Sequence, residues 1–243
     1  MLRGYDEVIL IDTGSYSYRV PLLERLDRLG LRPEDVTSVV LTHCHWDHIC
    51  NYPLFPRAKV FVPNDDLEWA LNQPVGTWHI PEFHVEKLES DQRVIRIREG
   101  DEFLPGLRAI ATPGHTPGHL SYIARGKRAD LIFAGDAVKN QAELMTGRVD
   151  MTLDLVSSTA SVRYLRALVA KDPSNIIVCG HDRLLGLDGG NLMYLADLQA
   201  TVSARLSPQF ENETVIDLAQ DRISGAQNVN VSRAARPPQW PED

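Results

Sequence analysis

The stretch Thr42-His43-Cys44-His45-Trp46-Asp47-His48 carries more chemistry than any other part of this chain. Three histidines and one aspartate fall within six residues, directly after a short apolar run at residues 37–41. Imidazole is a favoured zinc ligand, and a carboxylate can bridge two divalent cations. The stretch therefore predicts a metal site at the end of a β-strand.

Three more candidate ligands, His115, Asp136 and His181, each stand directly after a glycine. They follow apolar runs at residues 107–112, 130–134 and 175–179, which we expect to be strands. A glycine before a ligand lets the backbone turn sharply and approach a metal closely. With the first stretch, these residues are enough for two metals, and a two-metal site predicts hydrolysis by a metal-activated water.

The composition of the 243 residues, 43% hydrophobic and 24% charged, is typical of a globular protein with a sizeable core. Because ligands from residues 43 to 181 must converge on one site, we expect a single domain over residues 1–206. Residues 207–243 form a more polar C-terminal extension, and we expect its tip at residues 236–243 to be poorly ordered.

The composition also bears on location and partners. No apolar stretch reaches the roughly 18 to 20 residues that a membrane helix needs, and the first residues lack the apolar segment of a signal peptide. We therefore expect a cytoplasmic protein without a membrane partner. The net charge of −8 disfavours a large nucleic-acid surface, which is usually basic.

Hydrophobic periodicity predicts sheets covered by helices. Further strands are expected at residues 7–12, 37–41, 59–62, 93–97 and 120–124, and helices at residues 20–29, 154–170 and 191–206. Residues 72–92 show no clear periodicity, so they are either a substrate wall or a surface loop with its aromatic side chains in the core. His79 and His84 in this segment favour surface positions, whereas His119 favours a hydrogen-bonding role beside a ligand.

Five motifs together resemble the metallo-β-lactamase fold superfamily of dinuclear hydrolases, over roughly residues 7–185. The matching pieces are Asp12-Thr13-Gly14, the stretch at residues 42–48, Thr112-Pro113-Gly114-His115-Thr116-Pro117-Gly118-His119, Gly135-Asp136 and Gly180-His181. The resemblance implies a mixed α/β fold, a four-layer αββα sandwich, with the site at one edge of its two sheets.

The resemblance also implies a role for each ligand. It assigns each metal three side chains of its own, with Asp136 bridging: His43, His45 and His115 for the first metal, and Asp47, His48 and His181 for the second. Asp12 would lie behind the ligands and orient the loop that carries them.

Three positions narrow the choice among families within this superfamily. The commonest zinc β-lactamases carry a cysteine at the position of Asp136 and lack the histidine corresponding to His48, so antibiotic hydrolysis is not the first expectation. Flavodiiron proteins carry an acidic residue at the position of His45, which disfavours oxygen reduction. The pattern is the one shared by glyoxalase II, acyl-homoserine lactonases, ribonuclease Z-like nucleases and assorted phosphodiesterases.

We therefore expect a metal-dependent hydrolase of an ester-type bond, with a lactone or similar small acyl ester as substrate. Asp47 and Asp136 are the catalytic candidates, because Asp47 can both ligate a metal and pass a proton to the leaving group. Apolar and basic side chains are expected to line the substrate pocket: Trp46, Trp78, Phe83 and Lys139.

Other functions use the same ligands. A phosphodiesterase or nuclease, a thioester hydrolase, a mononuclear iron sulfur dioxygenase and a non-enzymatic metal-binding protein remain alternatives. Zinc is the expected metal, although a site of nitrogen and oxygen ligands also accepts iron or manganese. We expect a small-molecule substrate, and a second copy of the chain could cover a sheet edge to make a homodimer.

Overall fold

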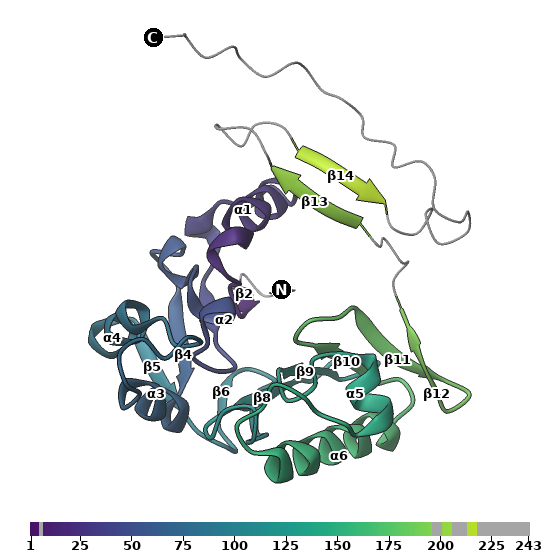
Figure 1. Ribbon diagram of the computed structural model, residues 1–243. Helices are drawn as coiled ribbons and strands as arrows, with labels where there is room; N and C mark the ends of the chain where they lie inside the picture. The colour runs from purple at the N-terminus through teal and green to yellow at the C-terminus, as the bar shows by residue number, and fades with distance from the viewer. Residues whose placement is uncertain (5–6, 196–200, 206–212, 218–243) are drawn as a thin grey trace, which may run out of the picture. The chain divides into compact units, whose positions relative to one another are not determined.

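The computed structural model describes residues 1–4, 7–195, 201–205 and 213–217 (Figure 1). The chain divides into two compact units, Met1–Leu195 and Ala196–Asp243. This division comes earlier than the expected boundary after residue 206, and the expected disordered tip at residues 236–243 lies outside the described residues. Every candidate ligand belongs to the first unit.

The first sheet is built from the N-terminal part of the chain, in the order β1-β2-β3-β4-β5. β1 is antiparallel to β2, and the other neighbours are parallel. Its strands are β1 (Leu2–Gly4), β2 (Glu7–Ile11), β3 (Ser38–Val40), β4 (Lys59–Pro63) and β5 (Val94–Ile97). The helices between them are η1 (Tyr16–Tyr18), α1 (Arg19–Arg28), η2 (Pro33–Asp35), α2 (Trp46–Ile49), η3 (Tyr52–Leu54), α3 (Asn64–Leu71) and α4 (Glu82–Ser90).

The second sheet has the order β12-β11-β10-β9-β8-β7-β6, with β9 and β10 parallel and its other neighbours antiparallel. Its strands are β6 (Glu102–Leu104), β7 (Leu107–Ala111), β8 (Leu120–Ala124), β9 (Leu131–Gly135), β10 (Ile176–Cys179), β11 (Leu184–Asp188) and β12 (Asn191–Tyr194). Two helices, α5 (Gln141–Thr146) and α6 (Leu155–Lys171), connect β9 to β10.

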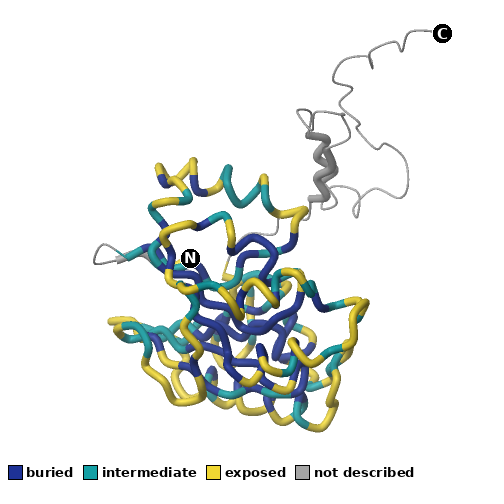
Figure 2. Tube along the Cα trace, turned by 90° about the vertical axis from the view of Figure 1, so that its left-hand side faces the viewer, coloured by how far each residue is buried: buried dark blue, intermediate teal, exposed yellow. Residues whose placement is uncertain are grey.

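The strands alternate their side chains between two faces, and this alternation builds the layers. Val39 packs with α1, α3 and α4 on one face of the first sheet, whereas its neighbour Val40 faces the second sheet. In the second sheet, Phe133 faces the first sheet and Ile132 packs against α6. The result is the expected helix–sheet–sheet–helix sandwich (Figure 1), with its buried residues gathered in the interior (Figure 2).

Two segments differ from the expected elements. The aperiodic stretch contains α4, whose buried Val85 and Leu88 share one face while the exposed Phe83 obscures the pattern. The expected helix at residues 191–206 is wrong, because β12 and β13 (Thr201–Arg205) are strands. Positive φ angles at Gly189 and Gly190 (+54° and +86°) form the two-residue turn that pairs β12 with β11.

The second unit contains a two-stranded antiparallel sheet, in which β13 pairs with β14 (Glu213–Asp217). Across the described parts of the chain, every helix is too short or too polar to cross a membrane.

Candidate metal centre

The candidate ligands lie at the carboxyl ends of four strands. β7 and β9 are both antiparallel to β8, and β9 is parallel to β10, so these three strands run in the same direction. The loops that follow them therefore emerge at one edge of the second sheet and deliver His115, Asp136 and His181. The loop after β3 and the short helix α2 bring the other ligands from the first sheet.

The first cluster consists of His43, His45 and His115, whose ligand atoms lie within 4.8 Å of one another. Hydrogen bonds orient two of these rings. Thr42 Oγ1 donates to Asp12 and lies 3.0 Å from His43 Nδ1, so Nδ1 carries the proton and Nε2 is free.

The Met151 carbonyl orients the third ring of this cluster. It accepts a hydrogen bond from His115 Nδ1 at 3.0 Å, which leaves His115 Nε2 facing His45 Nδ1, also at 3.0 Å. Met151 has a left-handed backbone (φ +43°), a conformation uncommon for methionine. Met151 thus contributes to the site through its backbone carbonyl.

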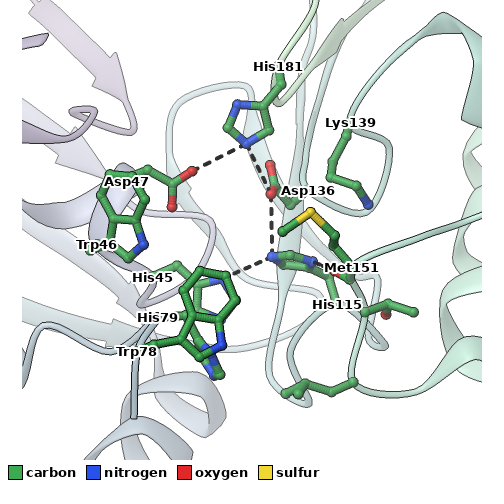
Figure 3. A pocket seen from close by; sticks show the side chains of 12 residues that line it. His45, Trp46, Asp47, Trp78, His79, His115, Asp136, Lys139, Met151 and His181 are labelled. Atoms are coloured by element: carbon green, nitrogen blue, oxygen red, sulfur yellow. Dashed lines mark hydrogen bonds and ion pairs between the residues drawn. The ribbon is translucent and has the colours of Figure 1, made fainter. Parts of the chain in front are cut away.

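The second cluster consists of Asp47, His48, Asp136 and His181. Asp12 accepts a hydrogen bond from His48 Nδ1 at 2.8 Å, so that Nε2 faces the carboxylates. His181 Nε2 lies 3.3 Å from Asp47 Oδ2 and 3.2 Å from Asp136 Oδ2 (Figure 3).

Asp136 stands between the two clusters. Its Oδ2 lies 3.3 Å from Nε2 of His115, in the first cluster, while its Oδ1 lies 3.4 Å from Nε2 of His48, in the second. A side chain at Gly180 would come within 2.1 Å of Asp136 Oδ1, so glycine is required there. This placement suits a carboxylate that touches two cations at once.

The electrostatics of the cluster fit metal ligation. Burial lowers the pKa of His45 to about 2 and that of His115 to about 4, which keeps the rings in the neutral form that binds metals. Burial opposes ionisation of Asp136, but the hydrogen bond with His181 and the electrostatic effect of the nearby His48 and His115 rings outweigh it and hold its pKa well below the usual value.

Several buried atoms at the centre have no hydrogen-bond partner, which is costly unless another group satisfies them. Among the described residues they include His43 Nε2, His48 Nε2 and Asp136 Oδ1. The two groups of nitrogen and oxygen ligands therefore fit two divalent cations.

The two ligand clusters open into a pocket of about 450 Å³ (Figure 3). The lining residues are His45, Trp46, Asp47, Trp78, His79, His115, Asp136, Lys139, Met151, Thr152, Leu153 and His181. The structure thus brings three of the expected pocket residues, Trp46, Trp78 and Lys139, to the cluster. Phe83 is not among the lining residues and lies 84% exposed on α4.

The pocket's lysine is already paired. Lys139 Nζ lies 2.7 Å from the buried carboxylate of Glu143 and donates to the Asp150 carbonyl at 2.9 Å. Its positive charge is therefore largely compensated before any substrate enters.

Some residues around the site were not singled out by the sequence. Asp66, fully buried at the start of α3, accepts a hydrogen bond from the peptide nitrogen of Cys44, between two ligands, at 2.6 Å. Burial raises its pKa to about 6. Asp66 lies in the first turn of α3, and nothing local in the sequence indicates its partner.

Two histidines of the aperiodic segment separate in the structure. His79 lines the pocket, with its ring centroid 4.7 Å from that of His45, so the surface expectation does not hold for it. His84 instead lies beside Tyr16, outside the pocket lining.

Comparison with known proteins agrees with this geometry. A family model described as the metallo-beta-lactamase superfamily matches residues 1–181. An N-acyl homoserine lactonase from Bacillus cereus is 26% identical over 159 residues, which cover 65% of this chain and 60% of that protein. Metallo-beta-lactamase domain-containing protein 1 from Xenopus laevis is 30% identical over 136 residues, or 56% of this chain and 52% of that protein.

Solved structures resemble the fold as a whole. AidC, described as a dizinc quorum-quenching lactonase in complex with a product, superposes with a TM-score of 0.67 at 17% identity, covering 81% of this chain and 77% of that one. The chain spans about 60% of the length of the curated lactonase from Bacillus cereus that it matches. Because the family match extends over most of its length and includes every candidate ligand, the chain belongs to the metallo-β-lactamase superfamily.

Proposed function

We propose that this protein is a dinuclear metal-dependent hydrolase that opens an ester-type bond, with a lactone as its substrate. The observation that carries the proposal is that Asp136, a member of the second ligand cluster, also lies beside His115 of the first, and that residues of both clusters line one pocket. The lactonase relatives point to the same class of substrate.

When bound, two divalent cations at these clusters would activate a water molecule and polarise the substrate carbonyl. Asp136, which lies near histidines of both clusters, would be among the residues that hold both cations. Asp47 stands at the pocket wall beside His181, where its carboxylate can ligate and also pass a proton to the leaving alkoxide. Zinc suits these ligands best, and iron or manganese would also fit.

The pocket favours a neutral, partly apolar substrate. Trp46, Trp78, Met151 and Leu153 offer an apolar surface beside the metal clusters. A phosphodiester is negatively charged and gains from a cationic side chain beside it, whereas Glu143 already engages the pocket's Lys139. Lactone and thioester carbonyls are neutral, so the lactone is preferred over the phosphodiester.

A paired assay on metal-quantified protein tests this function. A medium-chain acyl lactone and bis-(p-nitrophenyl) phosphate are compared, each with and without a chelator. We expect chelator-sensitive lactone opening and little phosphodiester turnover. The reverse preference would replace the proposal with a phosphodiesterase, and two bound metals without either activity would move the search to thioesters.

Two matched aromatic variants test the substrate pocket. Trp78→Ala is expected to raise KM for the acyl lactone by about tenfold with little change in kcat, because an aromatic contact to the acyl group is lost. Phe83→Ala is the control, since Phe83 lies outside the pocket lining. Equal KM values for the two variants would contradict this pocket assignment.

A further inference from the structure

We propose that His119 is a positioning residue that holds the peptide group of Asp136, and so sets where the bridging carboxylate stands. This inference rests on the proposed dinuclear site. His119 is 1% exposed and belongs to neither ligand cluster among the described residues. Both of its ring nitrogens form hydrogen bonds outside the ligand clusters' centre, one with the Asp136 peptide nitrogen and one with Thr112, and these two contacts define its role.

A series of four hydrogen bonds runs from the peptide nitrogen of Asp136 to the carbonyl of Ala134, in the preceding strand β9. The Asp136 peptide nitrogen lies 3.1 Å from His119 Nε2, and His119 Nδ1 lies 2.9 Å from Thr112 Oγ1. Thr112 Oγ1 lies 2.8 Å from Ser121 Oγ, which donates to the Ala134 carbonyl at 2.9 Å. We call this series the His119 hydrogen-bond chain.

The chemistry of the two ends gives the chain one direction. A peptide N–H can only donate, so His119 Nε2 must be the acceptor and the ring proton must sit on Nδ1. Nδ1–H then donates to Thr112, whose hydroxyl donates to Ser121, whose hydroxyl donates to the carbonyl of Ala134. Every group of this buried chain is satisfied in that direction only, which fixes the tautomer of His119.

The chain begins and ends on either side of Gly135. Ala134 and Asp136 flank this glycine, which has a left-handed backbone with φ of +50°. A side chain at position 135 would lie only 2.8 Å from His119 Nε2. The two peptide groups that define the turn at the end of β9 are therefore held by one imidazole and two hydroxyls.

This turn decides the geometry of the candidate metal centre. Asp136 must present its carboxylate to three histidines from three different loops, at 3.2–3.4 Å. Groups that act in such a site have to be held within about 0.5 Å, by neighbours that are themselves locked. The His119 hydrogen-bond chain supplies that lock without contributing a metal ligand.

Conservative variants separate this role from simple space filling. In His119→Gln, the amide oxygen can reach the position of Nε2 and still accept from Asp136. In His119→Asn, the shorter amide replaces Nδ1 and reaches only Thr112, which leaves the Asp136 N–H without a partner. Each amide thus keeps one contact of the ring, Gln that with Asp136 and Asn that with Thr112, so weaker metal binding by His119→Asn than by His119→Gln would identify the Asp136 contact as the one that matters.

The experiment measures zinc stoichiometry and affinity of the full chain by competition with a chelator, together with Tm. We expect two zinc ions for the wild type and for His119→Gln. For His119→Asn we expect weaker binding of one ion by about tenfold or more, as for other residues that orient ligands. Equal affinities for the two variants, or wild-type affinity for His119→Asn, would overturn the proposal.

A second pair keeps the test informative if the His119 variants do not fold. Thr112→Val removes the acceptor of Nδ1–H at nearly constant volume, whereas Thr112→Ser keeps a hydroxyl. We expect zinc binding to weaken for Thr112→Val, but by less than for His119→Asn because the contact with Asp136 remains. Thr112→Ser should restore it, and equal behaviour of the two Thr112 variants would count against the chain.

Imidazole nitrogen NMR of the metal-free protein gives an independent reading. It should show His119 as the neutral Nδ1–H tautomer, and an Nε2–H tautomer would refute the proposed direction. None of these measurements uses lactone turnover. If the wild type binds two zinc ions but opens no lactone, only the proposed function is contradicted. If it binds fewer than two zinc ions, the dinuclear site is contradicted, and with it the role proposed for His119.

Discussion

Asp12 shows how a single residue without a predicted ligand role shapes the site. Its backbone is left-handed (φ +56°), which aspartate tolerates better than most residues. In that conformation its carboxylate accepts three hydrogen bonds of 2.8 Å, from the Thr42 amide, the Thr42 hydroxyl and His48 Nδ1. One carboxylate therefore orients His48 directly and His43 through Thr42.

Replacing Asp12 by asparagine should weaken metal binding. The amide nitrogen of Asn cannot accept, so one or two of the three hydrogen bonds is lost and the orientation of His48 is relaxed. We expect zinc affinity to fall about 10- to 100-fold, as for other residues that hold ligands in place. Competition with a chelator measures the change, and Asp27→Asn on the exposed side of α1 is the control. Unchanged affinity for Asp12→Asn would contradict the orienting role.

At the scale of elements, α6 links the core to the pocket wall. Its N-cap residue Asp154 accepts hydrogen bonds from the amides of Val156 and Ser157, at 2.9 and 3.2 Å. The Asp154 amide in turn donates to the carbonyl of Gly114, next to the ligand His115. The start of the helix is thus joined to the loop that carries a ligand.

Removing this cap should cost stability in a measurable way. Asp154→Ala leaves two helix amides without their partner, and such a loss typically costs about 1 kcal/mol. For a domain of this size, we expect Tm to fall by roughly 2 to 4 °C. Asp154→Ser keeps a capping oxygen and should restore most of the loss. Identical melting temperatures for the two variants would argue against capping as the cause.

At the scale of the whole first unit, the site joins the two sheets. His43 and His48 follow β3 of the first sheet, whereas His115, Asp136 and His181 follow strands of the second. The carbonyl of Thr42 also accepts a hydrogen bond from the amide of Leu120 in β8, at 3.0 Å. Cations bound here would connect side chains from both halves of the sandwich.

Metal removal should therefore lower the thermal stability of the protein. A ligand present at 100 to 1,000 times its Kd stabilises the folded state by about 3 to 4 kcal/mol. We expect Tm of the zinc-loaded chain to exceed that of the chelator-treated chain by roughly 5 to 15 °C. Chelator saturated with zinc beforehand is the control for its ionic effects. Equal Tm values with and without metal would contradict a metal site between the sheets.

Local patterns were sufficient for much of this fold. The apolar runs before His43, His115, Asp136 and His181 are strands as expected, because buried strands need continuous apolar sequence. The helix expected at residues 191–206 was wrong because apolar spacing in a short segment does not distinguish a helix from a strand. Gly189 and Gly190, directly before this segment, indicate its structure better, since they permit the turn that pairs β12 with β11.

By itself, the sequence predicted the candidate ligands, the strands that precede them and a site for two cations, because these depend on residue type and near neighbours. Only the tertiary structure decided which nitrogen of each histidine faces the centre, that Glu143 engages Lys139, and that Trp78 lines the pocket while Phe83 does not. It also decided the partners of Asp12 and His119, both expected beside the ligands: His48 Nδ1 for Asp12, and the peptide nitrogen of Asp136 for His119. Such contacts join residues far apart along the chain, and only the packing of the two sheets brings their donors and acceptors within hydrogen-bonding distance.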